Sequence, residues 1–370
     1  MKRALILGGT GVMGVYLIEI MSKWKGWDVW VTSRKTRFPL APNIHYIQGD
    51  ARDDIFIHTI LEDHYDVIVD FMNYGYQEFM DRVQLLLHST DHYLFLSSCR
   101  VFAESTSTIT ESSPRLLDVT EDKDFLKTQR YALRKARQED ILYNCGENNW
   151  TIIRPYITYG DARLQLGIYE KEQWLYRFLN NKKLVIRKEI LDKKTALTSG
   201  KDVSLAISRL MGMHEAYGEA INIVTKETMT WGEILEIYQK ILTKETSKIF
   251  EIYTTTYFPI IEECFEGGYN TLYDRLYDRA FCSDKVDKFC GDIEYLPMRI
   301  GLEEALTNFL HSGAHFLPIQ WDFEACQDRM FGDISALEAF ENDEQHMIYL
   351  EYLKSEKYSD IDSYLFEKLI

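Results

Sequence analysis

The first fourteen residues constrain the fold of this chain more than any other stretch. A short apolar run leads directly into three glycines spaced three residues apart, Gly8, Gly11 and Gly14. Glycine is needed where a chain turns tightly, where its backbone approaches a pyrophosphate, and where a helix meets a strand closely. The helix that follows such a turn offers free N–H groups and a positive dipole end to phosphate. The pattern predicts a dinucleotide-binding turn that includes Val12 and Met13, and a tight turn without a ligand is the alternative.

Short apolar runs alternate with helix-period segments through the first half of the chain, which is the pattern of a parallel sheet wrapped by helices. The runs are continuously apolar, so both faces of the predicted sheet are covered. We therefore predict an α/β fold with a doubly wound parallel (Rossmann) sheet. The predicted strands span residues 3–7, 28–32, 45–48, 67–71, 93–97 and 151–154, and the clearest helices span 12–23 and 79–88.

After residue 160 the pattern becomes irregular, which indicates a smaller substrate domain interleaved with the first. It contains an amphipathic helix at 231–242 and an aromatic-rich stretch at 247–281, which either packs in a core or stacks on a sugar or base. A C-terminal helical extension follows, as either a docked surface appendage or an oligomerisation or lid element. The predicted division is a dinucleotide-binding domain (1–160 and 190–226), a substrate domain (161–189 and 227–313) and an acidic extension (314–370).

The chain is strongly acidic, with 42 lysines and arginines against 58 aspartates and glutamates and a formal net charge of −16. Such a chain repels polyanions, so nucleic acids and anionic membranes are disfavoured as partners. Six cysteines without a CxxC pair indicate neither a zinc site nor a disulfide framework, and we predict no metal. No run approaches the ~20 apolar residues that a membrane helix needs. These features together predict a reduced, soluble, cytoplasmic protein.

The residues after the second predicted strand indicate which cofactor the glycine turn would bind. A fold that prefers NAD carries an acid there to hold the ribose 2′-hydroxyl, whereas this chain has Ser33 followed by Arg34. Serine and arginine suit a 2′-phosphate, so NADP is favoured over NAD, and a solvated loop charge is the alternative for Arg34. Asp50 is expected to accept from the adenine amino group, to cap the next helix, or to do both. The predicted cofactor-binding residues also include Ala51, Phe71 and Pro155.

A second group of polar residues follows the buried run at 93–97. Ser97 and Ser98 end this strand, and ligands of doubly wound sheets bind at the carboxyl ends of the strands, so both serines are predicted to face the cofactor. Tyr131 and Lys135 are one helical turn apart, and an ammonium beside a phenol favours the phenolate. The arrangement predicts a general acid/base, with a serine hydroxyl holding a substrate oxygen.

The order of these motifs resembles the extended short-chain dehydrogenase/reductase superfamily, often labelled NAD-dependent epimerase/dehydratase, over residues 1–313. The resemblance implies that Tyr131 is the acid/base, that Lys135 binds the nicotinamide ribose and tunes Tyr131, and that Ser98 orients the substrate. Many members form dimers through the helices around the Tyr-Lys segment, so a homodimer is a further expectation. The matching motifs are GGTGVMG (8–14), GDARD (49–53), SSCRVF (97–102), YALRK (131–135) and RPYITYGD (154–161).

Some positions depart from the pattern of that superfamily. Its sugar-nucleotide dehydratases carry an Asp-Glu pair where this chain has Cys99 and Arg100, so dehydratase chemistry is disfavoured. Its nucleotide-sugar enzymes commonly carry an asparagine where Ile157 stands, which disfavours the usual pose of a UDP- or dTDP-sugar. The first third also resembles the branch of chloroplast stem-loop RNA-binding proteins, through Arg34 and the Val69-Asp70 pair.

The motifs and the resemblance together predict an NADP-dependent oxidoreductase that reduces a nucleotide-linked keto-sugar in surface-polysaccharide assembly. An epimerase that retains its NAD or NADP and uses the same three residues is the first alternative. A non-catalytic scaffold that binds a nucleotide or RNA is the second, because a fold alone does not determine a function.

Overall fold

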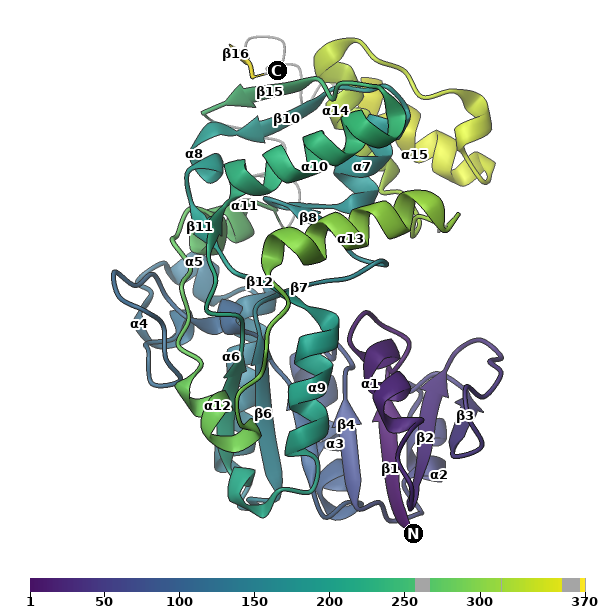
Figure 1. The fold of residues 1–370 in the computed structure, drawn as a ribbon, viewed down its shortest axis with the longest axis vertical. Coiled ribbons are helices and arrows are strands. Elements are labelled where there is room, and N and C mark those ends of the chain that lie inside the picture. The colour runs from purple at the N-terminus through teal and green to yellow at the C-terminus, as the bar shows by residue number, and fades with distance from the viewer. Residues whose placement is uncertain (257–266, 314, 355–366, 370) are drawn as a thin grey trace. The chain divides into compact units, whose positions relative to one another are not determined.

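The computed structural model describes residues 1–256, 267–313, 315–354 and 367–369. The chain divides into two units, each made of several segments (Figure 1). The first unit contains 1–160, 196–228 and 279–298, and the second contains 161–195, 229–278 and 299–370. This division differs from the predicted one in two main respects: residues 279–298 belong to the first unit rather than to the substrate domain, and the residues after 313 belong to the second unit rather than to a separate extension.

A seven-stranded sheet forms the centre of the first unit, in the order β13-β6-β5-β4-β1-β2-β3, and every neighbouring pair is parallel. This arrangement confirms the predicted doubly wound α/β fold. All six predicted strands form within two residues of their predicted bounds. The strands are β1 (Lys2–Leu7), β2 (Trp27–Ser33), β3 (Ile44–Gln48), β4 (Val67–Asp70), β5 (Tyr93–Leu96), β6 (Trp150–Pro155) and β13 (Glu219–Ile223).

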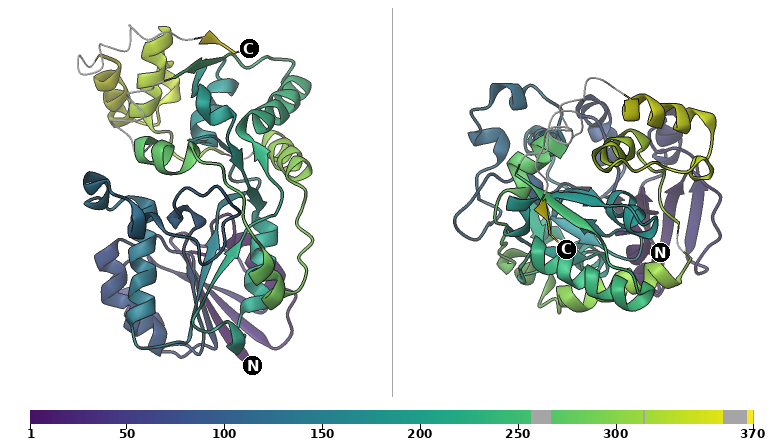
Figure 2. Two further views of the ribbon diagram at one scale, coloured as in Figure 1. Left: turned by 90° about the vertical axis from the view of Figure 1, so that its left-hand side faces the viewer. Right: turned by 90° about the horizontal axis from the view of Figure 1, so that it is seen from above.

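Helices cover both faces of this sheet, as the left-hand view of Figure 2 shows. One face carries α1 (Gly14–Met21), α9 (Gly200–Leu210) and α12 (Asp284–Cys290), and the other carries α2 (Asp54–Ile60), α3 (Tyr76–His88) and α6 (Tyr131–Asn144).

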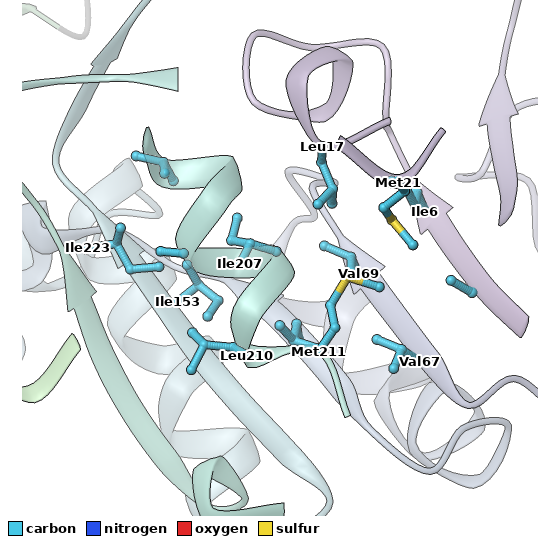
Figure 3. Close-up of a cluster of buried hydrophobic side chains, with 14 of the residues drawn as sticks. Ile6, Leu17, Met21, Val67, Val69, Ile153, Ile207, Leu210, Met211 and Ile223 are labelled. Atoms are coloured by element: carbon cyan, nitrogen blue, oxygen red, sulfur yellow. The ribbon is translucent and has the colours of Figure 1, made fainter. Parts of the chain in front are cut away.

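Successive strand residues alternate between two buried clusters, one under each helical layer. Ile6, Val67 and Val69 join the cluster that packs on α1 and α9 (Figure 3), whereas Leu5 and Ile68 join the cluster that packs on α2, α3 and α6. Because both clusters are apolar, the strands carry apolar residues at consecutive positions, as at Ala4–Leu7 and Val67–Val69, which is why the sequence lacks an alternating pattern here.

Short elements complete the first unit. They are η1 (Cys99–Val101), α4 (Leu116–Val119), α5 (Lys123–Leu126), η2 (His214–Ala216), and the parallel pair β7 (Ile157–Tyr159) and β12 (Leu197–Ser199).

The second unit is built on small sheets and on helices. β10 (Leu184–Arg187) pairs in parallel with β15 (Ile252–Thr255), which pairs antiparallel with β16 (Glu367–Lys368). Two further antiparallel pairs join β8 (Gln165–Leu166) to β9 (Tyr169–Glu170) and β11 (Lys194–Thr195) to β14 (Met229–Thr230). The helices are α7 (Lys171–Leu179), α8 (Lys188–Leu191), α10 (Trp231–Thr246), α11 (Gly267–Asn270), η4 (Thr271–Arg275), α13 (Met298–His311), α14 (Trp321–Phe331), η5 (Leu337–Ala339) and α15 (Asp343–Lys354).

Buried ion pairs hold the C-terminal helices in the second unit. Arg177 Nη1 lies 2.8 Å from Glu324 Oε1 and 2.9 Å from Asp328 Oδ1, and Lys182 Nζ lies 2.8 Å from Glu324 Oε1. The Tyr349 hydroxyl donates to Asp328 Oδ2 at 2.8 Å. The predicted acidic extension therefore supplies buried counter-charges to the rest of this unit.

Two predicted features fall partly outside the described residues, namely residues 257–266 of the aromatic-rich stretch and residues 355–366 of the extension. Among the helices of the described ranges, none combines the length and the apolar character needed to cross a membrane.

Candidate active site

The glycine turn lies between β1 and α1, and its three glycines serve different purposes. Gly8 has a φ of +68°, which favours glycine. A Cβ at Gly14 would overlap the backbone of Gly9, so this position also requires glycine for folding. Gly11 is exposed, and a Cβ there would meet only the Gly8 carbonyl oxygen at 3.9 Å, which is ordinary contact. The fold therefore leaves the space above Gly11 open.

A cavity of about 460 Å³ lies beside this turn, at the carboxyl ends of β1, β2, β3 and β4. Six of the residues predicted to bind the cofactor line it: Gly8, Ser33, Arg34, Asp50, Ala51 and Phe71. The other six lining residues are not among the predicted cofactor-binding residues, although three of them belong to the motifs at 8–14 and 49–53: Thr10, Thr32, Gly49, Arg52, Met72 and Asn73. Five of them adjoin a predicted site residue in the chain and Asn73 lies two residues after Phe71, so the strand ends themselves were the signal.

The remaining predicted cofactor residues lie elsewhere in the first unit. Val12 packs on Gly160 and Gly200, since a Cβ on either glycine would come within 3.0 Å of it. The Met13 carbonyl accepts the Ser204 hydroxyl at 2.7 Å. Pro155 is buried at the end of β6.

The polar groups around the cavity hold its loops in place. The Ser33 hydroxyl donates to the Lys35 carbonyl at 2.8 Å, and Arg52 Nη2 donates to the Asn73 carbonyl at 2.7 Å. Asp50 Oδ1 accepts the Arg52 N–H at 3.0 Å. The expectation that Asp50 caps α2 is wrong, because Asp53 is the N-cap and accepts the Phe56 N–H at 2.8 Å.

Tyr131 and Lys135 occupy the first two turns of α6. Lys135 is almost fully buried, and its Nζ donates to the Leu96 carbonyl at the end of β5 at 2.7 Å. Burial lowers the pKa of Lys135 to about 7, and the charge of Asp70 opposes this shift. Tyr131 is half-buried, with the Arg100 guanidinium carbon 5.1 Å from its ring centroid. The helix thus presents a phenol and an ammonium one turn apart.

The two serines after β5 have different surroundings. Ser97 donates to Glu139 Oε1 at 2.5 Å, and both Glu139 oxygens accept from Arg154 at 2.7 Å. Ser97 therefore belongs to a buried charge network that joins α6 to β6. Ser98 caps η1 and accepts the Arg100 N–H at 3.2 Å, which leaves its own proton available to another acceptor.

Cys99 beside these serines is a buried packing residue. Its Sγ donates to the Arg154 carbonyl at 3.0 Å, and burial raises the pKa of its thiol well above the usual range. A neutral thiol is a poor nucleophile, so nothing here supports covalent chemistry at Cys99. Among the described residues, no group of three histidine, cysteine or acidic side chains could hold a metal ion.

Comparisons with known proteins extend this description. The family model described as "NAD dependent epimerase/dehydratase family" matches residues 4–223. A dTDP-glucose 4,6-dehydratase from Bacillus anthracis, solved with NAD, is 18% identical, with a TM-score of 0.65 and coverage of 86% of this chain and 100% of that one. A search of curated proteins finds no match.

Two solved epimerases are similar to the chain to the same degree. The UDP-glucuronic acid 4-epimerase from Bacillus cereus, solved with NAD, is 16% identical with a TM-score of 0.62, and the coverage is 84% of this chain and 98% of that one. The UDP-N-acetylglucosamine 4-epimerase from Methanobrevibacter ruminantium, solved with UDP-N-acetylmuramic acid, is 15% identical with a TM-score of 0.63, and the coverage is 85% and 99%. At such identities the likeness shows the fold.

Proposed function

Since the chain belongs to the NAD dependent epimerase/dehydratase family, we propose that it is an NAD(P)-dependent oxidoreductase that reduces a nucleotide-linked keto-sugar. The observation that carries this proposal is the pair on α6. Tyr131 is half-buried, and Lys135 one turn later is buried with its Nζ anchored on the end of β5, the strand that Ser98 follows. A phenol beside an ammonium at the carboxyl end of a parallel sheet suits proton transfer to a carbonyl oxygen.

In the proposed reduction, Tyr131, Lys135 and Ser98 each have a different role. Bound nicotinamide supplies the hydride that reaches the carbonyl carbon. Tyr131 donates its proton to the carbonyl oxygen, which leaves an alcohol and a phenolate. The Lys135 ammonium stabilises that phenolate until Tyr131 regains a proton from solvent. The Ser98 hydroxyl donates a hydrogen bond to the same oxygen, and so stabilises the negative charge that develops on it.

The glycine turn and the adjacent cavity fit a dinucleotide. Gly11 leaves room for a pyrophosphate where the fold itself does not need a glycine. Ser33 and Arg34 line the cavity where NAD-preferring folds carry an acid, and Arg34 is exposed. A guanidinium suits a 2′-phosphate, and on this ground we propose that NADP is preferred over NAD.

The epimerase is the second candidate, because two of the similar solved structures are named as 4-epimerases. It would use the same three residues to oxidise the sugar and, after the sugar has rotated, to reduce it again. An epimerase regenerates its cofactor in every cycle and has no need to exchange it. A reductase must release the oxidised cofactor after each turnover, so cofactor retention separates the two.

Further parts of the proposal rest on the family resemblance. They are a sugar or nucleotide-sugar substrate, a homodimer and a role in polysaccharide assembly. The proposed cytoplasmic location rests instead on the composition and the cysteine pattern. A non-catalytic scaffold that binds a nucleotide or RNA predicts instead that Tyr131→Phe leaves function intact. We expect that substitution to reduce turnover at least 100-fold.

The first experiment is to denature the purified protein, identify any released nucleotide, and titrate the emptied protein with NADPH and NADH. We expect little retained cofactor and tighter binding of NADPH, and Arg34→Ala should weaken NADPH binding about tenfold while leaving NADH binding unchanged. Arg37→Ala, in the same exposed loop but away from the cavity, is the matched control. Retained NAD would favour the epimerase, and binding of neither nucleotide would refute the proposal that the chain is an NAD(P)-dependent enzyme.

A further inference from the structure

Asp70 is a buried carboxylate for which the proposed mechanism has no use. It is the last residue of β4 and only 1% exposed. Because Val69 faces α1 and α9, the strand alternation turns Asp70 with Ile68 towards α3 and α6. Its Oδ1 accepts the Met72 N–H at 2.9 Å, and its Oδ2 accepts the Tyr93 hydroxyl at 2.8 Å. Both donors are neutral, so neither balances the charge of the carboxylate.

Lys135 reaches the same place from α6. Its Nζ lies 4.6 Å from the ring centroid of Phe95, and Phe95 is the residue of β5 that pairs with Asp70. Its hydrogen bond to Leu96 is likewise to a neutral group. A buried ammonium and a buried carboxylate therefore share one face of the sheet, at the ends of neighbouring strands. Charges interact strongly in such surroundings because little water screens them.

Other charged and titratable groups also act on this pair. Tyr93 from β5 and Tyr74 from the segment after β4 favour the ionised form of Asp70. Arg134 disfavours the charge on Lys135, whereas Glu139 supports it. The charge of Glu139, however, is already balanced by the Arg154 guanidinium, which donates to both of its oxygens.

Asp70 has the largest effect of any charge on Lys135. Burial raises the pKa of Asp70 to about 6 and lowers that of Lys135 to about 7, and the charge on each group opposes the shift of the other.

We propose that Asp70 is a positioning residue whose carboxylate holds Lys135 in its charged form, and that it acts on Tyr131 through Lys135. The role in turnover rests on the proposed function, whereas the pairing of the two charges does not. Without Asp70, the ammonium would be buried beside Arg134 with no free carboxylate to balance it, and Lys135 would lose its proton at a lower pH. Tyr131 would then lose one of the cations that stabilise its phenolate, while the Arg100 guanidinium carbon would stay 5.1 Å from its ring centroid.

The direct test is a titration of Lys135 by NMR in protein that carries ¹³C-labelled lysine. The Cε resonance of Lys135 is assigned by its absence from the Lys135→Met variant. Asp70→Asn keeps the acceptor for the Met72 N–H but removes the charge, and we expect it to lower the midpoint of Lys135 by about one pH unit or more. Asp202→Asn is the matched control, because Asp202 also accepts a backbone N–H, from Leu296 at 2.9 Å.

An unchanged midpoint in Asp70→Asn would overturn the proposal. If that variant does not fold, Tyr93→Phe gives the second test, because loss of the hydroxyl favours the protonated form of Asp70 and should shift Lys135 in the same direction by a smaller amount. An unshifted Lys135 in Tyr93→Phe would then overturn the proposal.

The functional readout is the pH dependence of NADPH affinity and of turnover. Its alkaline limb should move to lower pH in Asp70→Asn, and should stay in place in Asp202→Asn. A merely structural role would lower both quantities at every pH without moving the limb, and would refute the role in turnover. If the wild type binds no dinucleotide but Asp70→Asn still shifts Lys135, the charge pairing is supported and the proposed function fails.

Discussion

Replacing Gly11 by alanine separates the ligand-binding role of the glycine turn from its role in folding. The new Cβ would meet only the Gly8 carbonyl oxygen at 3.9 Å, so it creates no steric conflict within the chain. Losing a glycine also restricts the unfolded chain, which stabilises the folded state by about 0.4–1 kcal/mol where the backbone conformation allows it. We therefore expect Gly11→Ala to unfold at the wild-type temperature or slightly above. The same methyl group lies where a pyrophosphate would approach, and we expect NADPH binding to weaken at least tenfold, which is about 1.4 kcal/mol.

Gly14→Ala is the matched variant in the same turn, and its outcome should be the reverse. Its Cβ would overlap the backbone of Gly9, which cannot move away as a flexible side chain could. Overpacking of this kind costs about 1–3 kcal/mol. Thermal unfolding and fluorescence titration with NADPH measure the two effects separately. Wild-type cofactor affinity in Gly11→Ala would refute the reasoning, and so would a loss of stability equal to that of Gly14→Ala.

Three further outcomes follow from buried charges and hydroxyls. Burial lowers the pKa of His92 from 6.5 to about 3, so between these values the unfolded chain binds a proton that the folded chain does not. The free energy of unfolding should therefore fall as the pH falls below 6.5, by ~2 kcal/mol at pH 5. In urea unfolding, the free energy of unfolding of His92→Gln should depend less on pH than that of the wild type. Asp328→Asn leaves two buried cations short of a partner and should cost about 3–5 kcal/mol of unfolding free energy, whereas Asp322→Asn, at a less buried position of the same helix, should lie near wild type. Tyr349→Phe removes one hydrogen bond to Asp328 and should cost about 1–3 kcal/mol of unfolding free energy in the same assay. Equal stability of Asp328→Asn, Asp322→Asn and Tyr349→Phe would contradict the structural role of Asp328.

The sheet could be predicted from the sequence because its signals are local. Each strand is a short, continuously apolar run with polar or glycine residues at its end, and burial on both faces produces such a run wherever it occurs in the chain. The helix predicted at 231–242 likewise forms as α10, which begins at Trp231 and continues to Thr246. Its capping box between Thr230 and Glu233 is a local signal too.

The candidate site could be predicted only to the level of strand ends. Gly8, Ser33, Arg34, Asp50 and Phe71 meet at one cavity because parallel strands end at a common edge. Which acid caps α2 depends on where the first helical turn begins, and the segment 50–54 offers three acids for that role.

Two features depend on pairing between distant residues and left no local signal. Ser97 is predicted to face the cofactor because it ends a strand. Its hydroxyl instead donates to Glu139, which lies 42 residues away in the chain. The segment after residue 313 is predicted as an acidic extension, and its composition gives no sign that some of its acids are buried, because acidic side chains are seldom buried without a partner. Their partners are Arg177 and Lys182, and nothing in the sequence around 324–328 indicates that these cations lie beside it in space.

The distance in sequence between the paired charges of the second unit also sets an order for its folding during synthesis. Lys182 precedes Asp328 by 146 residues, and Arg177 precedes it by 151. A ribosome takes on the order of 10–30 s to add that many residues, and through this interval both cations belong in water, because an unpaired buried charge costs several kcal/mol. All seven strands of the central sheet in the first unit have been made by residue 223. The nascent chain can therefore assemble its seven-stranded sheet before the C-terminal helices of the second unit have been synthesised.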